Sequence, residues 1–182
     1  MAVWIDETGT IVRPAEGASI ERSPFRDMDI PEGLPERFTQ LLVQVKNIPE
    51  FSADYRAAIV DWAQHGNVSR FALCADEVIE RSQPRGIDEA RAAACFELGE
   101  HLRRTLGPGV GDEAAVPWWR EAHRLYPDNW TYKRQAWTLV TTPAGATEND
   151  LLQEPNDVYE GSWLDDVIAI GGGENYVVMP DL

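Results

Sequence analysis

The stretch that most constrains the fold is residues 114–137, AAVPWWREAHRLYPDNWTYKRQAW, which predicts two helices joined by a tight turn. Small and large apolar residues recur along it at helical spacing, as expected where one helix presses closely on another. Pro127 would end the first helix, and Asn129 would cap the second. Because an apolar helix face must be buried against another element, we expect a mainly α-helical protein.

Apolar residues at helical spacing predict further helices on both sides of this pair. We expect helices that begin at Pro35 and near Ser52, one over residues 75–81, a long one capped by Asp88, and a short one over residues 162–170. Residues 2–13 instead predict a β-hairpin, in which Gly9 supplies the positive φ of the turn. The expected domains are a hairpin with its linker (1–33), a helical region (34–140) and a mostly irregular acidic tail with one short helix (141–182).

The charge of the chain limits its partners. The net charge is −15, so nucleic acid and anionic membrane surfaces would be repelled. Arg134 is the last basic residue, and nine acidic residues follow it. That acidic tail is either solvated or docked on a basic surface, which could belong to a partner or to the chain's own helices. The N-terminus lacks the features of a signal peptide, and two cysteines form no disulfide framework, so we expect a cytoplasmic protein.

The central helices resemble one and a half tetratricopeptide (TPR) repeats. The matching residues are Phe96, Leu98, Gly99 and Leu102 on one helix and Ala115, Trp119, Ala122, Leu125 and Pro127 on the next. Gly99 and Ala122 would let the two backbones approach, and Trp119 would fill the space beside them. The gap between the two helices exceeds that of the repeat by about four residues, which we assign to a loop over residues 107–112.

Candidate functional residues are few. The sequence contains no C-x-x-C pair, phosphate-binding loop or other catalytic motif, and we expect no metal and no cofactor. Cys74 is a weak catalytic candidate, whereas Cys95 lies on an apolar helical stripe and is expected in the core. The candidate binding site is a basic and aromatic cluster, which either docks the acidic tail or binds a partner. Its members are Trp130, Tyr132, Lys133, Arg134 and Trp137.

Two segments of the chain resemble parts of one family. VWIDETGTIVRP (3–14) resembles the final β-hairpin of thioredoxin-like redoxins of the peroxiredoxin/TlpA/ResA type, with Trp4, Asp6 and Gly9 at structural positions. WWREAHRLYPDNWTYKRQAW (118–137) resembles the helical extension that follows the redoxin domain in some bacterial members. The resemblance implies thiol–disulfide or peroxide chemistry for a full-length relative. The W-C-x-x-C active site and the cis-proline of that family have no counterpart here.

Three hypotheses follow. The first is a non-catalytic helical interaction or scaffold region of a thioredoxin-like redoxin, whose partner is a protein or the missing redoxin half. The second is a thiol–disulfide oxidoreductase-related protein that acts through Cys74. The third is a peptide-binding TPR-like module that uses the helices of residues 88–137. Because no catalytic motif is present, the sequence favours the non-enzymatic alternatives.

Overall fold

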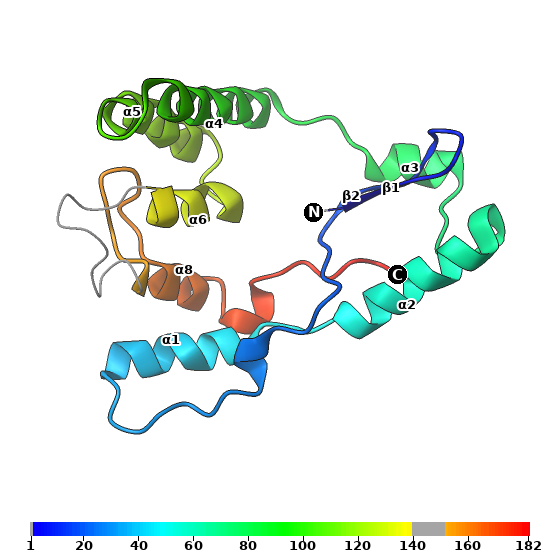
Figure 1. Cartoon of the computed structure of the whole chain (residues 1–182), viewed down its shortest axis with the longest axis horizontal. Coiled ribbons are helices and arrows are strands. Elements are labelled where there is room, and N and C mark those ends of the chain that lie inside the picture. The colour runs from blue at the N-terminus through cyan, green and yellow to red at the C-terminus, as the bar shows by residue number, and fades with distance from the viewer. Residues whose placement is uncertain (1, 140–151) are drawn as a thin grey trace. The chain divides into compact units, whose positions relative to one another are not determined.

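A computed structural model of the chain describes residues 2–139 and 152–182. In these residues the protein is mainly helical with one antiparallel two-stranded sheet at the N-terminus, as the sequence predicts (Figure 1). The main elements are β1 (Ala2–Ile5), β2 (Ile11–Glu16), α1 (Glu36–Asn47), α2 (Ser52–His65), α3 (Ala75–Arg81), α4 (Ile87–Leu106), α5 (Val110–Leu125), α6 (Trp130–Leu139) and α8 (Trp163–Ala169). Short 3-10 helices are η1 (Pro24–Arg26), η2 (Gly66–Val68) and η3 (Gly173–Asn175).

The chain forms two compact units. Unit 1 extends from the N-terminus to Pro84 and also includes Val167–Leu182, whereas unit 2 comprises Arg85–Asp166. These units do not follow the division at residues 33 and 140 that composition suggests. The reason is that residues 152–182 take part in both units instead of forming a tail of their own.

The hairpin of unit 1 turns at Asp6 and Gly9, as expected. The Asp6 Oδ1 atom accepts hydrogen bonds from the backbone N–H groups of Thr8 and Thr10, each at 2.9 Å. Gly9 has a φ of 84°, which glycine adopts without steric cost. The side chain of Asp6 thus closes the turn through hydrogen bonds to residues of the turn itself. These local contacts fix the register of the two strands.

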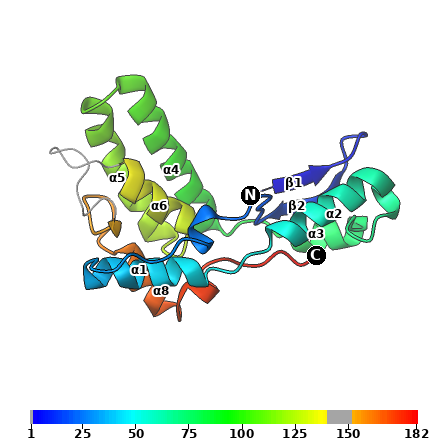
Figure 2. The same cartoon turned by 60° about the horizontal axis from the view of Figure 1, so that its bottom comes forward.

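One face of the hairpin packs on α2 (Figure 2). Trp4 and Val12 point into a buried cluster with Phe51, Tyr55, Ala58 and Phe71. The Trp4 indole N–H donates a hydrogen bond of 2.8 Å to the Tyr55 hydroxyl, so the polar atom of the buried indole is satisfied. The core of unit 1 is therefore built from aromatic side chains between a sheet and a helix.

A second packing contact in unit 1 lies between α1 and η3. Helix α1 begins at Glu36, one residue later than predicted because Pro35 is its N-cap, and it ends before Pro49 as predicted; η3 packs against it. The backbone N–H of Gly173 donates a 2.7 Å hydrogen bond to Gln44 Oε1, and a Cβ on Gly173 would collide with the Gln44 carbonyl oxygen. Glycine is therefore required at this close approach.

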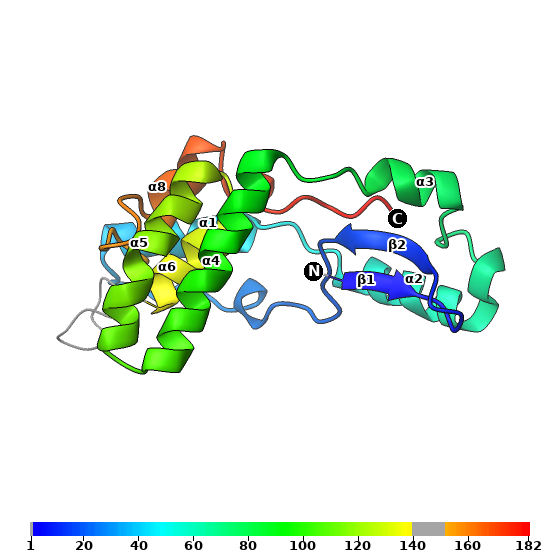
Figure 3. The ribbon, with the colours of Figure 1, turned by 90° about the horizontal axis from the view of Figure 1, so that it is seen from above.

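In unit 2, α4 and α5 lie antiparallel and side by side (Figure 3). Ala92 and Gly99 of α4 and Ala115, Trp119 and Ala122 of α5 are buried between them. A Cβ on Gly99 would collide with the indole of Trp119. The expected role of the small residues is thus confirmed, because they bring the two backbones close enough for one indole to fill the gap.

Two helix starts in unit 2 differ from the expectation. The N-cap of α4 is Gly86, whose N–H donates to the Glu89 carboxylate, and Asp88 lies in the first turn instead. Helix α5 begins at Val110, because the positive φ values of Gly107 and Gly109 reverse the chain within a few residues. Of the residues assigned to the loop, 107–109 form a turn and 110–112 belong to α5, which Asp112 caps by accepting the Gly109 N–H at 3.1 Å.

Residues 154–162 are irregular and a short helix, α8, follows them, as expected, but residues 152–166 are packed rather than solvated. Leu152, Val158, Trp163 and Leu164 are buried, and Val158 shares a cluster with Trp119. The predicted capping box of α8 is confirmed: the backbone N–H of Asp165 donates to Ser162 Oγ at 3.2 Å, and Ser162 Oγ donates to the Asp165 carboxylate at 2.6 Å. This segment therefore belongs to the core of unit 2.

Candidate functional site

The candidate binding cluster begins with the cap of α6. Asn129 Oδ1 accepts hydrogen bonds from the N–H groups of Thr131 (2.9 Å) and Tyr132 (3.2 Å), which confirms the predicted cap. This start places Lys133 and Trp137, one helical turn apart, on the buried side of α6. The helix therefore carries a cation into the interior of unit 2.

Among the described residues, Lys133 contacts one carboxylate and two aromatic rings. Its Nζ lies 3.0 Å from Asp166 Oδ2, and it stands 4.6 Å from the ring centre of Trp130 and 5.3 Å from that of Tyr159. The Tyr159 hydroxyl donates a 2.6 Å hydrogen bond to the same oxygen of Asp166. One carboxylate thus joins an ammonium group and a phenol, and the rings surround the cation.

The environment of Tyr159 keeps its phenol protonated. Burial raises the pKa of Tyr159 far above its usual value, and the hydrogen bond to the Asp166 carboxylate raises that pKa further. The phenol is therefore a permanent donor in the physiological range. It stabilises the charge of Asp166 together with Lys133.

His123 lies beside this ion pair and is only 7% exposed. Its ring stacks on Tyr159 at 4.8 Å and meets Tyr132 edge to face at 6.5 Å. Neither ring nitrogen has a hydrogen-bond partner among the described residues. Burial lowers the pKa of His123 from 6.5 to about 4; the Lys133 charge acts in the same direction, and Asp166 opposes it. His123 is therefore neutral at pH 7.

Two further hydrogen bonds fix residues 152–166 on α6. The Trp137 indole N–H donates to the Gly161 carbonyl at 3.3 Å, and Asn156 Nδ2 donates to the Ala136 carbonyl at 2.9 Å. With the Lys133–Asp166 pair, they tie the segment to the helix along its length. Of the two interpretations of the basic and aromatic cluster, docking of the chain's own acidic segment is the one these contacts favour.

The five predicted binding residues therefore fall into different environments. Tyr132, Lys133 and Trp137 are buried, Trp130 is half-buried, and Arg134 alone among the five has an exposed side chain. That these residues bind a partner stays a prediction. Lys133 is a poor probe for it, because a substitution there also removes an internal ion pair.

Sequence reasoning missed three members of the cluster: His123, Tyr159 and Asp166. His123 follows Trp119 by one helical turn, so the spacing of the two residues predicts that His123 lies on the buried face of α5. Asp166 pairs with a residue 33 positions earlier, and no local pattern links the two. Only the fold of residues 152–166 brings them together.

Cys74, the catalytic candidate, is exposed at the start of α3. Its backbone N–H donates a 2.8 Å hydrogen bond to the Glu77 carboxylate, and this bond and one from the Cys74 side chain lower the pKa of Glu77. Cys95 is half-buried and packs against Ala92, Ala122 and Tyr132. Both thiols are free, and no three His, Cys, Asp or Glu side chains of the described residues group as metal ligands do.

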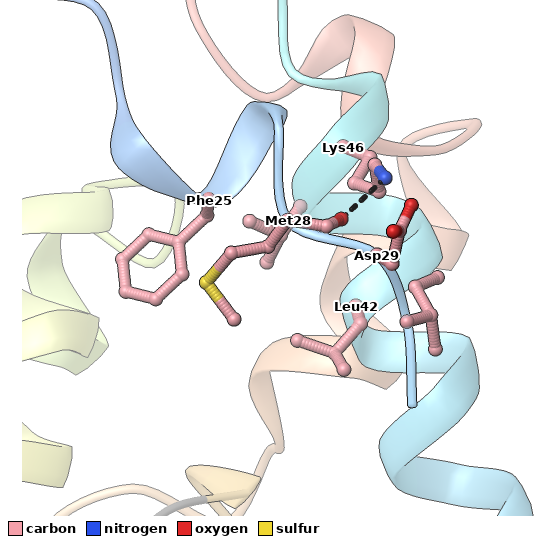
Figure 4. Close-up of a pocket in the computed structure, with 7 residues that line it drawn as sticks. Phe25, Met28, Asp29, Leu42 and Lys46 are labelled. Carbon is pink, nitrogen blue, oxygen red and sulfur yellow. Dashed lines mark hydrogen bonds between the residues drawn. The ribbon is translucent and has the colours of Figure 1, made fainter. Parts of the chain in front are cut away.

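A small hollow lies on α1 in unit 1 (Figure 4). Phe25, Met28 and Leu42 line it, and Asp29 and Lys46 stand at its edge. Lys46 Nζ donates a 2.6 Å hydrogen bond to the Met28 carbonyl, which ties the preceding connector to the helix. The space holds about one water molecule, which is too little for a small-molecule site.

No family model, curated protein or solved structure matches this chain. In the described part of the chain, no helix has the length and apolar character needed to span a membrane.

Proposed function

We propose that the chain is a non-catalytic helical interaction region of a thioredoxin-like redoxin, in which the hairpin β1–β2 joins the sheet of the redoxin half. The resemblance of residues 3–14 and 118–137 to that family supports the proposal. The main observation in support of the proposal concerns the hairpin: one of its faces is buried, and the opposite, exposed face is apolar.

The second face of the hairpin carries Val3, Ile5 and Ile11. These side chains are between 45% and 53% exposed, and Ile5 and Ile11 lie opposite each other in the strand register. Trp4 and Val12 occupy the face that packs on α2. Apolar β-branched residues on the outer face are typical of strands that are covered on both sides. A two-stranded hairpin is also marginal by itself, so a larger sheet would stabilise it.

The two edges of the hairpin differ. At β2, the Leu73 N–H donates to the Val12 carbonyl at 3.0 Å, and Arg13 Nη1 donates to the Phe71 carbonyl at 3.0 Å. No comparable backbone contact from the described residues occupies the outer edge of β1. An incoming strand would therefore pair with β1, as in β-strand addition.

Amide hydrogen exchange of the protein from its native host tests this proposal. If β1 pairs with a redoxin strand, the amides of residues 2–5 should exchange at least tenfold more slowly than in the isolated 182-residue chain, with α4 and α5 unchanged. An intact mass above 20.4 kDa, or a co-purifying redoxin, should accompany this protection. Equal exchange of β1 in both samples would contradict the proposal.

A pair of variants tests whether the outer face of β1 is the surface that binds the redoxin half. Ile5→Lys places a charge on the outer face of β1, so the association should weaken at least tenfold. Val68→Lys, at an exposed apolar residue of η2, adds the same charge elsewhere in unit 1 and should leave the association unchanged. If both substitutions act alike, the hairpin face is not the interface.

The exposed position of Cys74 favours a second candidate, a thiol–disulfide role with a partner's thiol in a reducing cytoplasm. Thiol titration at neutral pH distinguishes it from the first. A Cys74 that reacts much faster than a free thiol, with Cys95 as the internal reference, would support the enzyme. Equal and slow reaction of both thiols in the folded protein would exclude it.

A further inference from the structure

Two cavities of unit 1 share one wall. The first, of about 440 Å³, is lined by Phe51, Asp54, Arg70 and Phe71 and by residues 179–182. The second, of about 330 Å³, is lined by residues 14–17, by Arg81 and by residues 178–181. Residues 179–181 border both cavities, so this extended segment separates two parts of one depression.

Two arginines hold that segment. Arg13, which is 1% exposed, donates from Nη2 to the Asp181 carbonyl at 2.6 Å. Arg81 donates to the same carbonyl at 3.3 Å and to the Asp181 carboxylate at 2.9 Å. Gly17 leaves room for the backbone, because a Cβ there would lie 3.3 Å from the Val178 carbonyl oxygen. The contacts therefore recognise an extended backbone and one acidic side chain.

The segment itself is held loosely. Val178, Met179 and Leu182 are exposed, and the Asp181 side chain is 84% exposed. Its attachment depends on hydrogen bonds from Arg13 and Arg81. The Arg81 contacts lie at the surface, where ion pairs contribute little to stability, and Arg13 keeps Glu16 as its partner when the segment opens. The segment can therefore leave the depression without unfolding the aromatic core beneath it.

We propose that the two cavities form one groove that binds an extended acidic peptide, and that residues 178–182 occupy this groove in cis. Arg13 provides a buried donor for a backbone carbonyl, Arg70 lines the first cavity and Arg81 lines the second. Guanidinium groups suit carboxylates, and Phe51 and Phe71 offer apolar surface to residues beside the acid.

The acidic residues that line the groove restrict which peptides can bind in it. Glu16 already pairs with Arg13 at 2.9 Å, so it orients that guanidinium rather than competing for it. Asp54 lines the first cavity with Arg70 and would repel a second acid there. The fitting ligand is therefore an extended peptide with one acidic residue at the position of Asp181, flanked by proline or apolar residues. The combined space is of the size that bound ligands occupy.

The groove lies on the β2 side of the hairpin, so it does not depend on the proposed pairing of β1. Fluorescence anisotropy with a labelled synthetic peptide YVVMPDL, the sequence of residues 176–182, tests it on the full chain. In the wild-type protein the cis segment competes at an effective concentration of roughly millimolar. Asp181→Lys places a cation beside Arg13 and Arg81 and should release that segment, so the peptide should bind this variant at least tenfold more tightly.

Three controls make the result specific. Glu174→Lys makes the same charge change at an exposed residue of η3 and should bind as the wild type does. Arg81→Ala, added to Asp181→Lys, should weaken binding at least fivefold, whereas Arg22→Ala in the same background should not. A peptide with asparagine in place of its aspartate should bind at least fivefold more weakly. Absence of peptide binding to Asp181→Lys, or equal losses with the two arginine variants, would overturn the proposal.

Discussion

Both units are completed by a segment from the acidic end of the chain, but the two segments are held in different ways. Residues 152–166 bury Leu152, Val158, Trp163 and Leu164 in unit 2, and Asp166 reaches a buried lysine. Residues 177–182 lie on unit 1 with most of their apolar side chains exposed. The first segment is part of a core, whereas the second rests on a surface.

The cations that hold the two segments explain this difference. Among the described residues, Lys133 has one carboxylate partner, Asp166, so the loss of either group leaves the other without this counter-charge in the interior. Arg13 pairs with Glu16 and also donates to the carbonyls of Phe71 and Asp181. Arg13 thus keeps its counter-ion when residues 177–182 move. The same acidic composition therefore forms a permanent contact in one unit and an exchangeable contact in the other.

The largest effect should come from the helix pair on which residues 152–166 pack. Trp119→Ala removes the indole between α4 and α5 and should reduce the free energy of unfolding by about 3–5 kcal/mol, as large-to-small core changes do. Trp118→Ala is the matched control, because its side chain is 40% exposed, and it should cost about 1 kcal/mol or less. Urea denaturation measures both. A loss below about 1 kcal/mol for Trp119→Ala would place the indole outside the core.

The second prediction addresses the buried ion pair directly. Asp166→Ala leaves the Lys133 ammonium without its counter-charge and the Tyr159 hydroxyl without its acceptor, so it should cost about 3 kcal/mol. Asp157→Ala, at an exposed acid of the same segment, should change stability by less than about 0.5 kcal/mol. The double variant Lys133→Met, Asp166→Leu should recover most of the loss, since both charges are then absent. Equal effects of the two single substitutions would show that the pair is not buried.

Acid should weaken unit 2 through His123. Its pKa is lowered from 6.5 to about 4 in the folded state, so the stability it contributes is complete above pH 6.5. That stability is lost as the pH falls from 6.5 to 4, by up to about 3 kcal/mol. The ring faces Tyr132 and Tyr159, with Lys133 and Asp166 nearby, and protonation would add a cation beside Lys133.

Unfolding at pH 7.5 and pH 5 measures this dependence. His123→Phe should lose less stability on acidification than the wild type, whereas His101→Gln, at an exposed position, should behave as the wild type. The comparison removes the contribution of the carboxylates, which all three proteins share. An unchanged pH dependence in His123→Phe would show that the histidine is solvated.

The sequence predicts those features that depend on neighbours along the chain. Asp6 and Gly9 mark the hairpin turn, Ser162 and Asp165 mark the start of α8, and the helix over residues 75–81 has the predicted bounds. In each case the hydrogen-bonding partner lies within four residues. The start of α4 was wrong by two residues, because the side chain of Glu89 caps a glycine there and Asp88 is left in the first turn.

The features that position the candidate site depend on distant residues. Arg13 lies in a segment of mixed composition, and nothing near it indicates that Phe71 and Asp181 will accept its hydrogen bonds. Composition alone also left open whether the acidic tail is solvated. An acidic residue is expected to be exposed to solvent unless a buried cation can pair with it. Lys133 is such a cation, but its burial follows only from the packing of α6 against residues 152–166.

The smallest expected effect provides the sharpest test of the difference between the two segments. Asp181→Ala removes a carboxylate that is 84% exposed, while the carbonyl of residue 181 still accepts from Arg13. The free energy of unfolding should therefore change by about 1 kcal/mol or less. Asp166→Ala, measured in the same urea titration, is the reference for a buried partner. If Asp181→Ala costs as much as Asp166→Ala, residues 177–182 are as firmly held as residues 152–166, and the groove beneath them has no exchangeable occupant. If its cost stays near zero, unit 1 loses a surface contact and retains its core, which is the condition that peptide exchange at this groove requires.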